Sequence, residues 1–394
     1  MIPVLPLDVI ENIIDILVNE NPRSLPYVKA FSLTCQSFLP LCRKHIFSSI
    51  DVEITDSLEH LHSGEAFGRF LLETPGIAKH VRQLSVRIEH HSESGYFFDQ
   101  VSRQLTRLRS LTILCSTLGE ETVVAWRDIS SSMQRSLLSL IRLPTLTHLD
   151  LSSIRHFLIS DLITCTNLKH LCTNGLFTAD ANDDEVFSVL HKPIQLQVFV
   201  TMLTPAVSKL LGSKCSDGRP VLDFTLLKKL RIVLHWTGHA HKAREIFSGT
   251  QQLTDVDVTV ADITFRIMDF ANMITPSLQT LRRLRLSIDG WEMSDPVPDL
   301  CNQLETISGK NRLESIEIEN HVQSDEWDRL DRILLAPGWP MLERVSLTIV
   351  IFVSEINSPF KRIVENLAQN KLSGLMSSKN LDFHFLVQEH EIAR

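Results

Sequence analysis

A short apolar pattern, in which the first, fourth and sixth residues are apolar, recurs along the chain and constrains its fold most strongly. The units begin at Val81, Leu108, Leu146, Leu168, Leu227, Leu253, Leu281, Leu313 and Leu342. Consecutive units start 22 to 38 residues apart, except for one step of 59 that spans about two periods and contains the degenerate unit "LQVFV" near residue 196. The last two apolar positions alternate as strand side chains do, and helix-length segments such as "SSMQRSLLSLIRL" separate the units. Each period therefore predicts one strand and one helix.

Stacked strand–helix units of this length are typical of repeat solenoids, because each unit buries its apolar face on the next. The spacing wanders, and Ile154 or Leu176 stands where regular leucine-rich repeats carry Asn or Cys. We therefore expect an α/β fold, an irregular leucine-rich-repeat solenoid, over residues 51–394. Basic residues inside "LKKLRI" and "LRRLRL" alternate with leucines and are expected on the solvent side of the strands.

The first fifty residues contain no such unit and predict a separate module of three short helices, at 6–19, 26–34 and 36–47. The first helix is apolar over an arc of roughly 200°, whereas packing on one core needs about 100°. This arc contains Val9, Ile10, Ile13, Ile14, Ile16, Leu17 and Val18. The helix thus carries more apolar surface than a single core requires.

Composition excludes several classes of function. The net charge of −8 and the lack of a long Lys/Arg run argue against a nucleic-acid partner. No segment approaches the roughly 20 apolar residues that span a bilayer, and the N-terminus does not have the pattern of a secretory signal. Seven scattered cysteines, an odd number, favour reduced and mostly buried thiols, so we expect no membrane partner and a location in the cytoplasm or nucleus.

Three segments resemble metal or phosphate sites but lack the full pattern. His235, His239 and His241 have no nearby thiolate or carboxylate at matching spacing, and an exposed loop is expected there. The acidic segment 180–185 begins like a calcium loop but has Glu185 at the position that needs Gly. The loop 212–220 lacks the order of a phosphate-binding loop. We therefore expect no metal, no cofactor, no catalytic residues and no enzymatic activity.

The five tryptophans admit two interpretations. Trp126, Trp236, Trp291, Trp327 and Trp339 lie at strand ends or in connections. They serve either as exposed binding anchors or as wedges between repeats, and the second reading is favoured.

Several phrases carry a family likeness. "LPLDVIENIIDIL" resembles the opening of the F-box, and "AFSLTCQSFLPLCRKHIFSSI" (30–50) resembles its second half, with Phe38 where many members have Trp. "FLLETPGIAKHVRQLSV", "LIRLPTLTHLDLSSIRHFLISDLITCTNLKHL" and "WDRLDRILLAPGWPMLERVSLTI" resemble the F-box proteins with leucine-rich-like repeats of mushroom-forming fungi. The likeness covers nearly the whole chain and divides it into an F-box-like module, 1–50, and a repeat region, 51–394.

The resemblance implies a role in protein ubiquitination. In that family the F-box docks on a Skp-family adaptor, which joins it to a cullin-RING ubiquitin ligase, and the repeats hold the target protein. The adaptor-binding residues implied for this chain are Leu5, Pro6, Val9, Ile10, Ile13, Leu17, Leu33, Phe38, Leu41 and Phe47. The sequence does not indicate which protein is the target or which residues of the repeats bind it.

The alternative is a scaffold that has no ligase partner, in which residues 1–50 only cap the open end of the repeats. Docking leaves part of the first helix exposed in the isolated chain, whereas capping buries it. The exposure of Ile10, Ile13 and Leu17 therefore separates the two hypotheses.

Overall fold

The fold was analysed in a computed structural model of the 394-residue chain. The structure describes residues 6–20, 24–54, 63–89, 95–116, 124–157, 161–162, 164–174, 192–215, 217–234, 238–261, 270–288, 295–320, 324, 326–353 and 360–391. Within this part of the chain, no helix is long and apolar enough to cross a membrane.

In the described residues twelve strands form one sheet, and their order across the sheet is their order along the chain. They are β1 (Ser49–Ile54), β2 (Gln83–Glu89), β3 (Ser110–Ser116), β5 (His148–Ser152), β7 (His170–Asn174), β9 (Val198–Met202), β11 (Lys229–Leu234), β12 (Asp255–Val260), β13 (Arg283–Ile288), β14 (Ser315–Asn320), β15 (Arg344–Val353) and β16 (Asp382–Glu391). Two small sheets pair β4 (Val124–Ala125) with β6 (Ile154–Arg155), and β8 (Ile194–Gln195) with β10 (Leu222–Asp223).

The prediction of an irregular leucine-rich-repeat solenoid is wrong. The strands form a continuous parallel sheet with helices between them, which is a parallel α/β fold. The uneven spacing of the apolar units suggested irregular stacking, but the additional residues lie in the connections. The long step from Leu108 to Leu146, for example, accommodates β4 and a helix between β3 and β5.

The apolar units do mark the strands, and they hold a constant register. Leu84 pairs with Leu111, which in turn pairs with Leu149. Farther along, the same position of the unit is aligned through Leu230, Val256, Leu284, Ile316 and Val345. All of these side chains are buried. The degenerate unit near residue 196 is β9, which pairs in parallel with β11.

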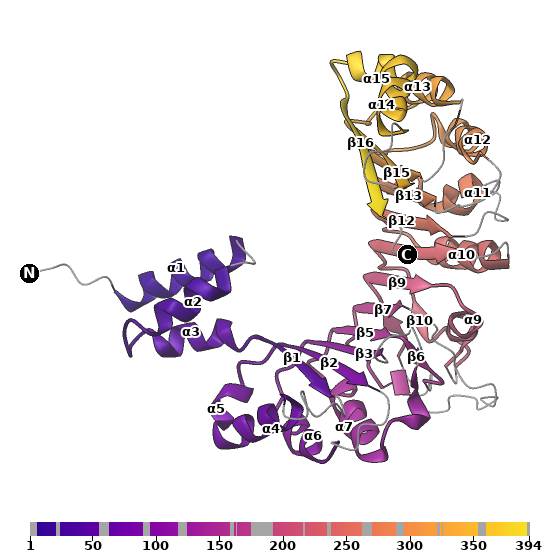
Figure 1. The fold of residues 1–394 in the computed structure, drawn as a ribbon. Coiled ribbons are helices and arrows are strands. Elements are labelled where there is room, and N and C mark those ends of the chain that lie inside the picture. The colour runs from indigo at the N-terminus through magenta and orange to yellow at the C-terminus, as the bar shows by residue number, and fades with distance from the viewer. Residues whose placement is uncertain are drawn as a thin grey trace, which may run out of the picture. The chain divides into compact units, whose positions relative to one another are not determined.

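Three of the described helices precede β1, and the others lie between consecutive strands of the sheet. The helices are α1 (Leu7–Glu20), α2 (Leu25–Ser32), α3 (Leu39–Ile46), α4 (Ser63–Glu73), α5 (Pro75–Ala78), α6 (Gly95–Ser102), α7 (Ser131–Ile141), α9 (Pro205–Gly212), α10 (Gly238–Gly249), α11 (Phe270–Ile274), α12 (Val297–Ile307), α13 (Trp327–Leu335), α14 (Phe360–Lys371) and α15 (Ser373–Ser377). Figure 1 shows α10, α11 and α12 on one side of β11, β12 and β13. The burial pattern agrees, since every second residue of these strands is buried and the residues between them are half-buried or exposed.

The chain comprises two compact units. The first contains Met1–Leu168 and Cys172–Ile194, and the second contains Lys169–Leu171 and Gln195–Arg394. The helices α1, α2 and α3 belong to the first unit and match the three predicted helical segments. The domain boundary predicted at residue 50 falls inside β1 and remains a prediction.

The tryptophans that the structure describes lie in the core. Trp126, Trp327 and Trp339 are buried, and the indole Nε1 of Trp339 donates a hydrogen bond to the carbonyl oxygen of Ile333 at 2.8 Å. This favours packing over exposed anchoring for these three. Trp236 and Trp291 lie outside the described residues.

Candidate functional site

The first helix carries two apolar stripes, one of which forms the core of a small bundle. Ile10, Ile14 and Val18 are spaced four residues apart and therefore share one face of α1. Ile14 is buried with Val28 of α2 and Cys42 of α3, and Ile10 and Val18 pack against this cluster. The inner stripe thus accounts for only part of the apolar arc.

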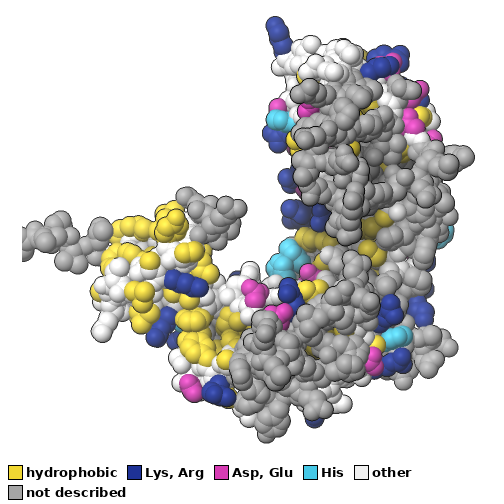
Figure 2. All heavy atoms as spheres, viewed as in Figure 1, with side chains coloured by type: hydrophobic (Ala, Val, Ile, Leu, Met, Phe, Trp, Pro, Cys, Tyr) yellow, Lys and Arg dark blue, Asp and Glu magenta, His cyan; other side chains and the backbone are white. Residues whose placement is uncertain are grey.

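The second stripe, called here the outer stripe, consists of Val9, Ile13, Ile16 and Leu17. These side chains are 37%, 44%, 53% and 49% exposed. Figure 2 shows hydrophobic side chains gathered on the surface of α1, α2 and α3. Scattered apolar residues are normal on protein surfaces, but a contiguous patch marks an interaction surface.

Apolar residues of α2 and of the loop after it are also exposed. Leu25 and Tyr27 lie on α2, and Leu33, directly after α2, is 87% exposed. In contrast, Phe31 and Phe38 stack face to face with ring centroids 4.6 Å apart. These rings pack against the core of the bundle, so the exposed apolar surface comes from other residues of the same segment.

Ion pairs fix the orientation of α1 on α3. Lys44 Nζ lies 2.6 Å from Glu11 Oε1 and 2.8 Å from Asp15 Oδ1, and His45 Nε2 lies 2.7 Å from the same Asp15 oxygen. The acidic side chains of α1 thus face the basic residues of α3. This contact is consistent with the inner stripe packing inward and the outer stripe facing solvent.

These ion pairs predict a pH dependence for the bundle. Partial burial raises the pKa of Asp15, but hydrogen bonds from Lys44 and His45 outweigh burial, so the pKa lies below its usual 3.8. A carboxylate with a lowered pKa stabilises the fold above its unfolded pKa, and this contribution is lost as the pH falls through the lower folded value. We therefore expect hydrogen-exchange protection of α1, corrected for intrinsic rates, to decline below pH 3.8. In Asp15→Asn this component of the decline should be absent.

The effect should be modest, because the carboxylate and ammonium groups are partly exposed and screened by water and salt. Asp8→Asn, a change of an exposed carboxylate on the first turn of the same helix, is the matched control. If Asp15→Asn and Asp8→Asn shift the acid transition equally, the contact with Lys44 and His45 does not cause it.

The ten residues predicted to bind an adaptor fall into three groups. Those exposed in the structure are Pro6, Val9, Ile13, Leu17 and Leu33. Those partly buried in the bundle are Ile10, Phe38 and Leu41, while Phe47 is half-buried with its ring centroid 5.7 Å from that of Phe70. Leu5 lies outside the described residues.

Four other exposed apolar residues of α1 and α2 are absent from the predicted set, namely Leu7, Ile16, Leu25 and Tyr27. Ile16 lies three residues after Ile13, so helical spacing alone places it beside the predicted positions. No comparable pattern marks Leu25 or Tyr27.

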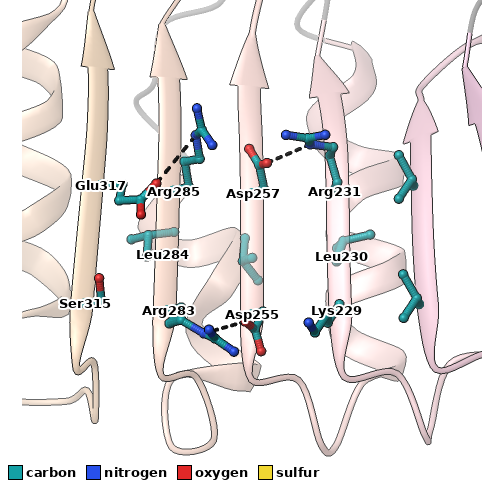
Figure 3. A pocket seen from close by; sticks show the side chains of 13 residues that line it. Lys229, Leu230, Arg231, Asp255, Asp257, Arg283, Leu284, Arg285, Ser315 and Glu317 are labelled. Atoms are coloured by element: carbon teal, nitrogen blue, oxygen red, sulfur yellow. Dashed lines mark hydrogen bonds and ion pairs between the residues drawn. The ribbon is translucent and has the colours of Figure 1, made fainter. Parts of the chain in front are cut away.

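A second surface lies in the second unit, on the face of the sheet opposite α10, α11 and α12. The strand register aligns charged side chains in two rows across β11, β12, β13 and β14. One row is Lys229, Asp255, Arg283 and Ser315, and the next is Arg231, Asp257, Arg285 and Glu317 (Figure 3). All-parallel sheets usually have both faces covered, so an uncovered charged face is a candidate interaction surface.

The segments that resemble metal or phosphate sites are only partly described by the structure. Within the described residues, no group of three His, Cys, Asp or Glu side chains could hold a metal ion. His235 and residues 180–185 lie outside that part of the chain. The loop 212–220 is closed by a bridge between Lys214 and Pro220.

Most of the thiols lie inside the protein. Cys42, Cys115, Cys165, Cys215 and Cys301 are buried. Burial raises the pKa of Cys115, Cys165 and Cys301 to about 12, which keeps these thiols protonated at neutral pH. They therefore lack the thiolate character of a reactive cysteine.

No protein-family model matches the chain, and no curated protein matches it. The site must therefore be interpreted from its own geometry.

Proposed function

We propose that the protein is the substrate-recognition subunit of an SCF-type ubiquitin ligase. In this proposal α1, α2 and α3 dock on a Skp-family adaptor, which links them to a cullin-RING ligase. The sheet region holds the target protein. The protein itself performs no chemistry and raises the effective concentration of the target near the ligase.

The proposal rests on the exposure of the outer stripe of α1. A helix that only capped the sheet would bury its apolar residues, whereas Ile13 and Leu17 are about half exposed. The resemblance of the first fifty residues to the F-box favours a Skp-family adaptor as the partner.

The size of the stripe is compatible with docking as part of a larger interface. Fully burying four apolar side chains contributes roughly 6–12 kcal/mol, and since these are already half-buried, the gain is smaller. Association costs roughly 4–15 kcal/mol. The interface therefore needs additional apolar area, which Tyr27 and Leu33 can supply.

Co-purification with a Skp-family adaptor tests the proposal. We expect the wild-type chain to retain the adaptor, and we expect Ile13→Asp and Leu17→Asp to lose it, because each would bury a carboxylate in an apolar interface. Asn12→Asp is the matched control, since it introduces the same side chain at an exposed polar position of the same helix. Equal recovery of the adaptor by wild type and both outer-stripe variants would refute docking.

A further inference from the structure

The uncovered face of β11, β12 and β13 forms a shallow hollow with mixed apolar and charged walls. The hollow has a volume of about 300 Å³. Val198 and Val200 of β9 line one side, and Lys229, Arg231, Arg283 and Arg285 supply the cations (Figure 3). It lies entirely within the second compact unit.

In two ion pairs of this face the acid lies below the arginine. Arg231 Nε lies 2.6 Å from Asp257 Oδ2, and the side chains are 53% and 21% exposed, respectively. Arg283 Nε lies 2.6 Å from Asp255 Oδ1, and these side chains are 64% and 21% exposed, respectively. A partner approaching these two pairs therefore meets the guanidinium groups before the carboxylates.

These arginines still have hydrogen-bond donors to offer. Both ion pairs use Nε, and among the described residues the terminal nitrogens of Arg231 and Arg283 have no acceptor. A guanidinium has five N–H donors arranged as a fork that matches a carboxylate or phosphate. The internal pairs therefore orient the two arginines without saturating them.

The spacing of the cations suits an extended chain. Residues two apart on a parallel strand lie roughly 6.6 Å apart, and β11 and β13 are roughly 9.6 Å apart. Arg283 and Arg285 thus match the spacing of alternate side chains on an extended peptide, and Lys229 and Arg231 form a second such pair. Apolar side chains between the acids of such a peptide could contact Val198 and Val200.

We propose that this face binds an extended acidic segment of a partner protein, one rich in aspartate or glutamate. The inference rests on the proposed function only in taking that partner to be the protein delivered for ubiquitination. Charge complementarity carries it, because four cations line the hollow against three carboxylates, and two of those carboxylates, Asp255 and Asp257, are only 21% exposed beneath their arginines. The third, Glu317, is half exposed at one edge of the hollow. This cationic excess contrasts with the net charge of −8 of the whole chain.

The direct test is binding of a labelled peptide to the full chain, measured by fluorescence anisotropy. The probe is a peptide of roughly eight residues, about the length of one strand, in which Glu alternates with Ala. We expect Arg231→Gln and Arg283→Gln each to weaken binding about tenfold or more, because each loses a charged hydrogen bond. We also expect Asp257→Asn to tighten binding, since it removes a negative charge and releases Arg231.

Arg344→Gln is the matched control variant. Arg344 on β15 forms the same kind of cross-strand ion pair, 3.1 Å from Asp382, but does not line the hollow. It should leave peptide affinity unchanged. A peptide with Gln in place of Glu should not bind, and circular dichroism checks that each variant is folded.

Several results would overturn the proposal. These are no binding of the Glu peptide, equal binding of the Gln peptide, or equal weakening by Arg344→Gln. Displacement of the peptide by an oligothymidine that binds more tightly would assign the face to nucleic acid instead. The assay contains no adaptor, and Ile13→Asp should retain the peptide, so failure here is distinguishable from failure of adaptor docking.

Discussion

Ile14→Ala will destabilise the bundle of α1, α2 and α3 by about 2–5 kcal/mol, the usual cost of truncating a buried isoleucine. Ile14 is 2% exposed and lies at the centre of the cluster with Val28 and Cys42. Three short helices have little other core to compensate for the loss. Amide hydrogen exchange on the full chain should show lost protection in α1 and α3, with protection of the sheet strands retained.

Ile13→Ala is the matched control, because it makes the same chemical change one residue away on the outer stripe. Ile13 is already 44% exposed, so exchange in α1 should change by less than about 1 kcal/mol. Comparable loss of protection in both variants would contradict the division of α1 into an inner and an outer stripe.

Gly338→Ala will destabilise the second unit by about 1–3 kcal/mol, the cost expected when an additional methyl group is forced into a packed region. A Cβ at this position would lie 1.6 Å from Ser308 Oγ and 3.1 Å from the backbone nitrogen of Gly309. The contact cannot open freely, because Gly309 N donates a 2.7 Å hydrogen bond to the carbonyl oxygen of Gly338. Urea unfolding followed by tryptophan fluorescence measures the effect, with the adjacent buried Trp339 as a reporter.

Gly212→Ala supplies the comparison within the same unit. A Cβ there would meet nothing within 4 Å, so the change should be neutral or stabilise the fold by up to about 1 kcal/mol. If Gly338→Ala unfolds at the same urea concentration as Gly212→Ala, the close approach to Ser308 does not constrain the fold.

The strand positions were predictable from the sequence, but the regularity of the sheet was not. The apolar unit identifies β2, β3, β5 and the later strands because one side of each strand is buried. The spacing between units reports the length of the connections rather than strand pairing. The uneven spacing therefore suggested irregular stacking of the strands. In the structure, however, Leu84, Leu111 and Leu149 are aligned across a regular parallel ladder. The edge strands β1 and β16 lie outside the recognised units.

The interaction surfaces were predictable to different degrees. The wide apolar arc indicated surplus surface on the first helix, but only contact with α2 and α3 separates Ile10, which packs inward, from Ile13, which is exposed. Alternation placed Arg283 and Arg285 on the solvent side of a strand. Their pairing with acids about thirty residues away depends on strand register, which composition and periodicity do not specify.

Calorimetric titration of the full chain with a purified Skp-family adaptor, at several temperatures, tests the central claim that the outer stripe is a docking surface. We expect saturable binding with a negative heat-capacity change, the signature of apolar burial. We also expect Ile13→Asp to weaken the affinity about a hundredfold or more and Asn12→Asp to leave it unchanged. Binding that Ile13→Asp leaves unchanged, or no heat from the wild-type chain, would contradict the claim.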